Sequence, residues 1–242
     1  MKKAFVVLLL SAATGIAAQC YLYTIRPLKR PDLSGSAIAL MGGFRSIAAE
    51  IVWFRADRLQ DEGRFVELSQ LASTLTFLEP HTSEVWSFAA WNLAYNISVM
   101  MPTYEDRWHW VESGLKLLRD EGLRMNPHDA DLYRELAWMF QIKLGSNIDS
   151  ASHVYRRKWA ETVNEVSKTG KWRTLGMDRA AMGEIEKHTN FTDWTDPLLS
   201  AVYWARQGLP YAKGSTRKFL VEIIRQSLFA MKKGRSAETE KA

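Results

Sequence analysis

The sequence predicts an all-α protein made of packed helical hairpins. Apolar residues recur at three- to five-residue spacing through most of the 242 residues, as on one face of a helix. Pro and Gly residues separate these segments and predict the helix ends. No stretch shows the apolar–polar alternation of a half-buried strand. An internal repeat, described below, relates two of the predicted hairpins.

Residues 1–25 form an apolar N-terminal segment. Lys2 and Lys3 precede the apolar run 4–10, and no further charged residue occurs before Arg26. This order is typical of a secretory signal. The span is also long enough to cross a bilayer core of about 30 Å as a helix. A signal-anchor that remains as a transmembrane helix and a signal that is cleaved are both open.

The flanking residues give an expectation for orientation and processing. Lys2 and Lys3 favour an N-terminus inside the cell, whereas the basic residues at 26–30 favour the reverse. The signal-like order leads us to expect a membrane-anchored protein whose body is exported to the periplasmic side, or alternatively a secreted one. Cys20 is the only cysteine, which excludes an intramolecular disulfide. Residues 17–20 partly match a lipidation motif, so lipidation of Cys20 stays an alternative.

The rest of the chain predicts a linker, one helical domain and a tail. Residues 26–45 contain Pro27, Pro31 and a Ser-Gly-Ser tract and predict a linker. The helical domain is expected over residues 46–233, and residues 234–242 are expected to be a disordered tail. Its predicted helices are 46–61, 64–77, a segment from 83, 107–124, a segment from 129 to about 144, 150–166, 197–207 and 215–233. The stretch 171–196 has weaker periodicity and predicts helix interrupted by loops.

Individual residues justify these elements. Ile47, Ile51, Phe54 and Leu59 lie roughly on one stripe of the first helix, and Gly63 is suited to ending it. Pro80 closes the first hairpin. The last helix carries its apolar residues on one face, which predicts a capping helix over the end of the domain. These apolar residues are Phe219, Leu220, Ile223, Ile224 and Leu228.

Residues 80–93 are repeated at 127–140. The matched pairs share residue type or size, which is expected when two helices begin and pack in the same way. The pairs are Pro80/Pro127, Val85/Leu132, Trp86/Tyr133, Ala90/Ala137, Trp91/Trp138 and Leu93/Phe140. The bulky residue predicts a core anchor, and the alanine predicts close approach of a neighbouring helix.

Residues 49–144 resemble tetratricopeptide repeats. That family has a bulky fourth residue, a small eighth residue and a Pro near the end of a unit of about 34 residues. Units beginning at residues 49, 83 and 130 supply this pattern, with Ala in place of the family glycine and with a second unit that is longer than usual. The resemblance implies stacked helical hairpins, an α-solenoid, whose inner helices line a concave groove.

Carried over position by position, the resemblance also implies which residues line the groove. They are Glu50, Trp53, Asp57 and Gln60, then Glu84, Ser87, Trp91 and Ala94, then Asp131, Arg134, Trp138 and Gln141. Trp and Arg dominate binding hot spots, so Trp53, Trp91, Arg134 and Trp138, with Asp57, Gln60 and Gln141, are the candidate partner-binding residues. The family's clamp for acidic peptide ends needs Lys and Asn where this chain has Trp or Asp.

Chemical motifs point away from an enzyme. The sequence has no phosphate-binding Gly-rich loop, nucleophile elbow or His-Glu-x-x-His pair, and its histidines are scattered. We therefore predict no catalytic residue, no cofactor and no bound metal. The net charge of +5 is spread thinly, and no nucleic-acid-binding module accompanies it.

The sequence thus predicts a membrane-tethered scaffold that binds a protein or peptide partner within a bacterial envelope assembly. Two alternatives remain. An envelope saccharide-binding protein or enzyme could use the tryptophans to stack on sugars, and the basic C-terminal helix could bind anionic lipid. Partner identity and oligomeric state do not follow from the sequence.

Overall fold

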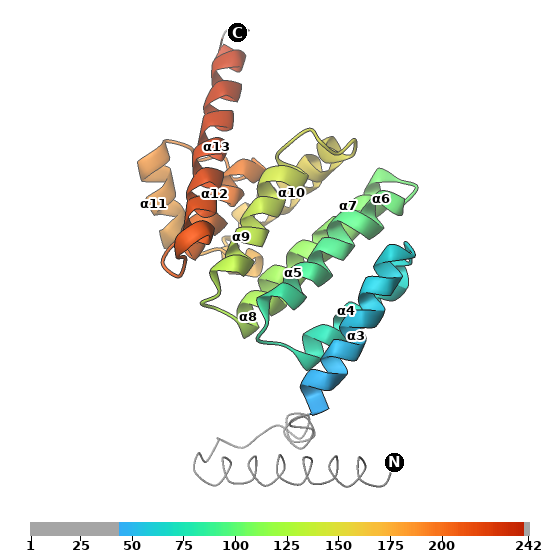
Figure 1. The fold of residues 1–242 in the computed structure, drawn as a ribbon. Coiled ribbons are helices and arrows are strands. Elements are labelled where there is room, and N and C mark those ends of the chain that lie inside the picture. Colours follow the sequence, from blue (N-terminus) through green and yellow to red (C-terminus); the bar gives the residue numbers. More distant parts are fainter. Residues whose placement is uncertain (1–43, 240–242) are drawn as a thin grey trace, which may run out of the picture.

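The computed structural model describes residues 44–239, which fold as an all-α protein with no strand among them (Figure 1). The predicted signal-anchor at residues 1–25 lies outside the described residues, as does nearly all of the predicted linker at 26–45. Among the helices that the structure describes, none has both the length and the apolar character to cross a membrane. The helical part begins at Phe44, two residues before the predicted start of the domain.

The helical elements follow one another through short connections along most of the described chain. They are α3 (Phe44–Asp61), α4 (Phe65–Leu78), α5 (Ser83–Trp91), η1 (Asn92–Ile97), α6 (Ser98–Met100), α7 (Tyr104–Lys116), η2 (Leu117–Gly122), α8 (Leu123–Met125), α9 (Ala130–Trp138), η3 (Met139–Leu144), α10 (Ser152–Thr169), η4 (Trp172–Leu175), α11 (Arg179–Thr189), α12 (Pro197–Gly208) and α13 (Gly214–Thr239). Segments η1, η2 and η3 are π-helical and continue the α-helices before them.

Helices α3 and α4 form the first hairpin, joined at Gly63, whose φ of 67° is one that glycine adopts without steric cost. The face of α3 that packs inward carries Ala49, Ala56 and Leu59. Of the predicted apolar stripe only Leu59 packs inward, whereas Ile47, Ile51 and Phe54 face solvent and are 55%, 65% and 76% exposed. The inward face of α3 thus combines small alanines with Leu59, and the other bulky residues of the stripe occupy the outer side.

The internal repeat of the sequence is reproduced in three dimensions. Helix α9 and segment η3 have the bounds of α5 and η1 shifted by 47 residues, including the change from α- to π-helix directly after Trp91 and Trp138. Near the start of each helix, Trp86 Nε1 donates to the Pro80 carbonyl at 2.9 Å and Tyr133 Oη donates to the Pro127 carbonyl at 3.0 Å. Each bulky residue thus ties the helix to the proline that precedes it.

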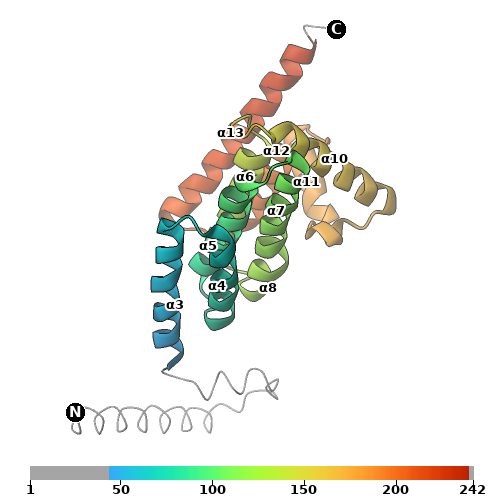
Figure 2. The ribbon, with the colours of Figure 1, turned by 90° about the vertical axis from the view of Figure 1, so that its right-hand side faces the viewer.

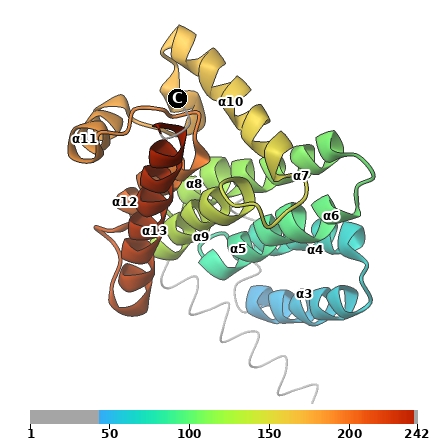
Figure 3. The same cartoon turned by 90° about the horizontal axis from the view of Figure 1, so that it is seen from above.

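The two copies differ in the helix that pairs with them. Helix α7 follows α5–η1 directly and packs against it, with Gly114 so close that an added Cβ would lie 2.8 Å from the Ala90 carbonyl oxygen. Helix α9 pairs mainly with α12, more than fifty residues later, rather than with α10, which follows η3 in the chain. Helices α10 and α11 lie off to one side of the row of hairpins (Figure 3).

Helix α13 closes the domain by packing on α9 and α12. Its apolar face buries Leu220, Ile223 and Met231, whereas Phe219 is 44% exposed. Beyond that contact the helix projects from the body (Figure 2). It continues through Gly234, where the sequence predicts the disordered tail to begin, to Thr239, because a single Gly costs a helix only about 1 kcal/mol.

Candidate functional site

The predicted groove residues of α3 have different surroundings and do not form one surface. Trp53 is half-buried, packs against Phe88 with ring centroids 5.0 Å apart, and its Nε1 donates to the Glu79 carboxylate at 3.3 Å. It belongs to a small core shared by α3, α4 and α5. Asp57 and Gln60 are exposed on the same helix.

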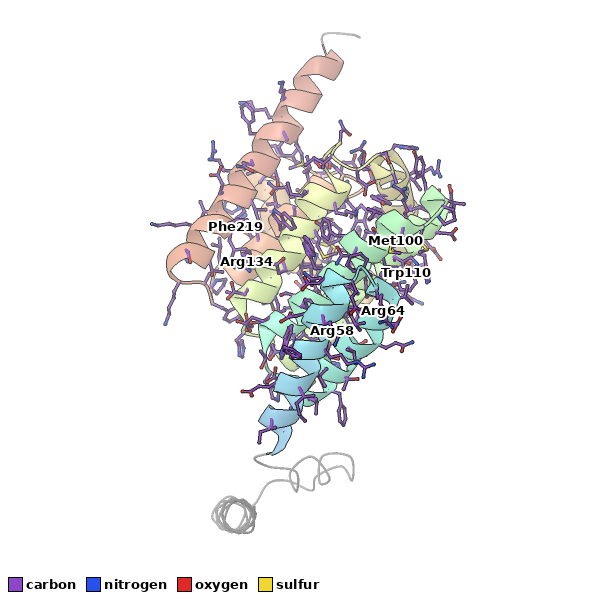
Figure 4. The ribbon with its side chains drawn as sticks, turned by 45° about the vertical axis from the view of Figure 1, so that its right-hand side comes forward. Arg58, Arg64, Met100, Trp110, Arg134 and Phe219 are labelled. Carbon is purple, nitrogen blue, oxygen red and sulfur yellow. The ribbon has the colours of Figure 1, made fainter. Side chains whose placement is uncertain are left out.

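The predicted residues Arg134 and Gln141 lie at the contact with α13. The guanidinium of Arg134 bonds Asp131 and Glu135, both at 2.7 Å, and lies over the ring of Phe219 (Figure 4). Gln141 is buried, and its Nε2 lies 3.2 Å from Ser227 Oγ and 3.3 Å from the carbonyl of Ile223. Helix α13 therefore covers part of the face that the sequence assigns to a partner.

Trp91 and Trp138 are brought together by a residue that the sequence analysis missed. The ring of Tyr95 stacks on Trp91 at 5.0 Å between centroids and on Trp138 at 5.6 Å. We call Trp91, Tyr95 and Trp138 the aromatic row. Trp91 is 43% exposed, and the other two are partly buried. The row joins the two copies of the repeat at the point where each becomes π-helical, a local geometry that is frequent at functional sites.

A pocket of about 360 Å³ continues from Tyr95. Its lining combines apolar and charged side chains. Its lining residues are Tyr95, Val99, Arg107, Ile142, Lys143, Ile148, Asp149 and Ser150. A volume of this size suits one large side chain or a small ligand.

The charged part of the lining centres on an ion pair between Lys143 and Asp149. Lys143 Nζ lies 2.6 Å from Asp149 Oδ2, is only 4% exposed as a side chain, and lies 4.8 Å from the ring centroid of Tyr95. Asp149 also accepts from Tyr155 Oη and from the Ala151 amide. Buried ions need such partners, because an uncompensated charge in the interior is costly.

The electrostatics follow from these contacts. Burial lowers the pKa of Lys143, although its bond to Asp149 acts in the opposite direction. Burial alone would raise the pKa of Asp149, but its hydrogen bonds, the strongest from Lys143, hold that pKa below the ordinary 3.8. The hydroxyl of Tyr95 is buried and makes no hydrogen bond within the described part of the chain, and burial raises its pKa. The middle ring of the row is therefore a neutral phenol beside a neutralised ion pair.

Two signals could have identified the missed residues. Tyr95 follows Trp91 by four positions, which places both rings on one face of a helix. Lys143 is a lone charge in the apolar segment 139–144, and a buried lysine requires a partner. Nothing in the sequence identifies Asp149 as that partner or brings Arg107 to the pocket.

The site offers exposed aromatic surface, an adjoining pocket and a set of fixed charges. Within residues 44–239 there is no group of three or more His, Cys, Asp or Glu side chains that could hold a metal ion. Such a combination of groups can hold a ligand in three ways: the aromatic rings stack on it, the pocket takes up one of its groups, and the charged side chains attract opposite charges. Comparisons with protein-family models, with curated proteins and with solved structures found no match for this chain.

Proposed function

We propose that this protein is a membrane-tethered helical scaffold that binds a peptide segment of a protein partner along the aromatic row. The single observation that carries the proposal is the stacked row itself. Three aromatic side chains from α5–η1 and α9 stack on one another, with Trp91 open to solvent. Rigid aromatic surface of this kind gives binding energy at little entropic cost.

The surroundings of the aromatic row support a role in binding, and not only a role in packing. Trp91 is held by stacking and not by burial, and an exposed Trp beside a pocket offers an anchoring point that no described segment covers. The hairpins α3–α4 and α5–α7 and the repeated start of α9 support a tetratricopeptide-like stack, in which such a face is the binding groove. The resemblance adds to this proposal and is not required by it.

Tethering is proposed from the sequence of residues 1–25. A basic start, an apolar run and no charge before Arg26 fit a signal-anchor, and the expectation of an exported body follows from that order. The partner is then expected within a bacterial envelope assembly.

The test places a photo-crosslinking amino acid at position 91 in the full chain. We expect irradiation of intact cells to join it to one protein at a defined segment. The matched control places the same group at position 54, which is also exposed but lies on the outer face of α3. Equal crosslinking at both positions, or none at position 91, would contradict the proposal.

A second experiment measures binding directly. Once the crosslinked partner is identified, Trp91→Ala should lower its affinity by about thirtyfold or more, the loss typical of a hot-spot residue. Phe54→Ala should leave that affinity unchanged. Thermal unfolding of both variants checks that the domain remains folded.

A further inference from the structure

The pocket beside Tyr95 has more positive than negative charge in its lining. Its charged lining residues are Arg107, Lys143 and Asp149, which give +2 − 1 = +1. The Asp149 carboxylate lies between the two cations, 2.6 Å from Lys143 Nζ and 3.9 Å from Arg107 Nη1. A single carboxylate can neutralise only one of them, so one positive charge remains.

Most charged residues around the lining are paired with one another. Glu105 of α7 is bonded by Arg157 at 3.2 Å, and Glu135 of α9 is bonded by Arg134 at 2.7 Å. Arg134 is shared with Asp131, but that acid lies about 18 Å along the helix from the lysine of the pocket. Charges at that separation are largely screened by salt.

Two further charges near the pocket offset each other. Asp106 is exposed on α7 and accepts a hydrogen bond from a hydroxyl group. Arg156 bonds the Ser146 carbonyl and the Asn147 side chain, so it lies against the loop that lines the pocket. The excess of one positive charge therefore remains when these neighbours are counted.

Arg107 is the cation that a ligand can reach. Its side chain is 21% exposed, whereas that of Lys143 is 4% exposed and closed in by its partner. The Arg107 guanidinium donates to the Met101 carbonyl at 3.3 Å and to Ser150 Oγ at 3.4 Å, both longer than an ordinary hydrogen bond. These bonds engage two of its five N–H donors.

Aliphatic side chains provide the rest of the lining. Val99 is 48% exposed and Ile148 is 79% exposed, and Ile142 lies between them in the lining, half-buried. Pockets that hold small ligands combine such apolar surface with a few polar groups that fix the orientation of the ligand. The pocket thus offers one accessible guanidinium beside a hydrocarbon surface.

We infer that this pocket binds an aliphatic carboxylate, with the carboxylate on the guanidinium of Arg107 and the hydrocarbon part against Val99, Ile142 and Ile148. A guanidinium can donate two parallel hydrogen bonds to one carboxylate. A single excess charge matches a monovalent anion, whereas a phosphate dianion would stay half neutralised. The inference does not require a partner at Trp91. The carboxylate belongs either to a free acid or to an acidic side chain of a bound protein segment.

The test titrates hexanoate into the full chain in a neutral detergent and measures the heat of binding. A titration into the same detergent without protein is subtracted. We expect saturable binding with a dissociation constant of about 1 mM, as for a ligand of this size. Hexanol should bind at least about tenfold more weakly, and hexylammonium should not bind, because each lacks the negative charge. Inorganic phosphate at matched ionic strength should not displace hexanoate.

Variants of Arg107 locate the carboxylate. Arg107→Met keeps a long side chain without the charge and should lower the affinity for hexanoate about tenfold or more. Arg107→Lys keeps the charge and should lower it less. The matched control Arg173→Met removes an exposed guanidinium from η4, outside the pocket, and should leave the affinity unchanged.

A second pair of variants leaves the contacts of Arg107 intact. Ile148→Glu and Ile148→Gln differ only in charge, at an exposed position of the lining. The Glu variant should bind hexanoate about two- to fivefold more weakly than the Gln variant, because like charges repel. Equal affinities of this pair, binding of hexylammonium as tight as that of hexanoate, displacement by phosphate, or no effect of Arg107→Met would overturn the inference.

A photo-crosslinking amino acid at position 148 in intact cells identifies the source of the carboxylate. Crosslinking to a protein segment that contains Asp or Glu assigns it to a side chain, and hexanoate binding without a crosslinked protein assigns it to a free acid. Crosslinking to a segment without an acidic residue overturns the inference. The proposed scaffold is tested at position 91, so a partner found there in a protein that does not bind hexanoate overturns only the inference about the pocket.

Discussion

The two copies of the repeat, α5–η1 and α9–η3, have the same local structure and different surroundings. Both begin beside a proline, both turn π-helical at the same place, and both carry Trp on the same face. In the first copy the face stays open at Trp91, whereas in the second α13 covers it at Gln141. The repeated sequence therefore determines the local structure of both helices. Segments later in the chain, such as α13, determine how much of each helix remains exposed.

The two copies have different surroundings because α10 and α11 are inserted between the second copy and the helix that pairs with it. The first copy receives its pairing helix at once, as α7, but the second receives α12 only after residues 145–196 have left and returned. The loop that starts this excursion is fastened by Asp149, which lies between η3 and α10. Variants at the contacts that distinguish the two copies can test this account.

The largest effect on stability is expected at Asp149. Asp149→Ala leaves the ammonium group of Lys143 buried without its partner, which should lower the free energy of unfolding by about 3–5 kcal/mol. Chemical denaturation measures it. Adding Lys143→Met should recover part of the loss. If the double variant is no more stable than the single one, the ion pair is not the cause.

The same carboxylate gives a pH dependence. Its pKa is lowered on folding, so its contribution to stability is present above the ordinary 3.8 and is lost as pH falls through the lower folded-state pKa. The loss of stability with falling pH in that acid range should therefore be steeper in the wild type than in Asp149→Asn. Parallel curves for the two proteins in acid unfolding would contradict the assignment.

The close approach of α7 to the first copy is the next test. Gly114→Ala should destabilise the protein by about 1–3 kcal/mol, because its Cβ would meet backbone at Ala90. Gly183→Ala is the control: nothing lies within 4 Å of its added Cβ, and helix propensity should make the protein about 1 kcal/mol more stable. Thermal unfolding distinguishes the two signs.

The cover over the second copy depends on a buried hydrogen bond. Gln141→Leu leaves the fully buried hydroxyl of Ser227 without its partner and should cost about 1–3 kcal/mol. Adding Ser227→Ala removes the orphaned group and should restore most of that stability. Urea denaturation of the two variants decides; an unchanged loss in the double variant would argue against the bond.

The smallest effect on stability is expected at the start of the second repeated helix, compared with the start of the first. Tyr133→Phe removes a hydrogen bond from an exposed hydroxyl and should cost no more than about 1 kcal/mol. Trp86→Phe removes both the bond to Pro80 and indole volume from a side chain that is 4% exposed, and should cost more. Equal losses in thermal unfolding would show that the two bulky residues anchor their helices equally.

Much of the helical content could be predicted, because periodic apolar residues and Gly and Pro boundaries act locally. The first helix shows the limit. Its apolar stripe predicted the helix correctly, but which face packs depends on α4. Of that stripe only Leu59 is buried, and the small Ala49 and Ala56 face the core beside it. A hydrophobic pattern identifies the buried face of a helix only when the bulky residues are also the packed ones.

The site was predictable in part for the same reason. Trp91 and Trp138 were identified from their equal places in the repeat, and the structure brings them together through Tyr95. Arg134 and Gln141 meet α13, which is more than seventy residues away in sequence, so their surroundings could not be inferred locally. Pairings at such separation depend on the whole chain.

The sequence by itself determined the helices, their repeated starting segments and the equal places of Trp91 and Trp138 in them, because helix formation and the facing of side chains depend on neighbours three to seven residues away. Only the tertiary structure decided that α12 pairs with α9, that α13 covers Gln141 and that Lys143 meets Asp149. Those outcomes depend on packing between distant segments, where shape and burial over the whole domain select one arrangement from many that the same local pattern allows.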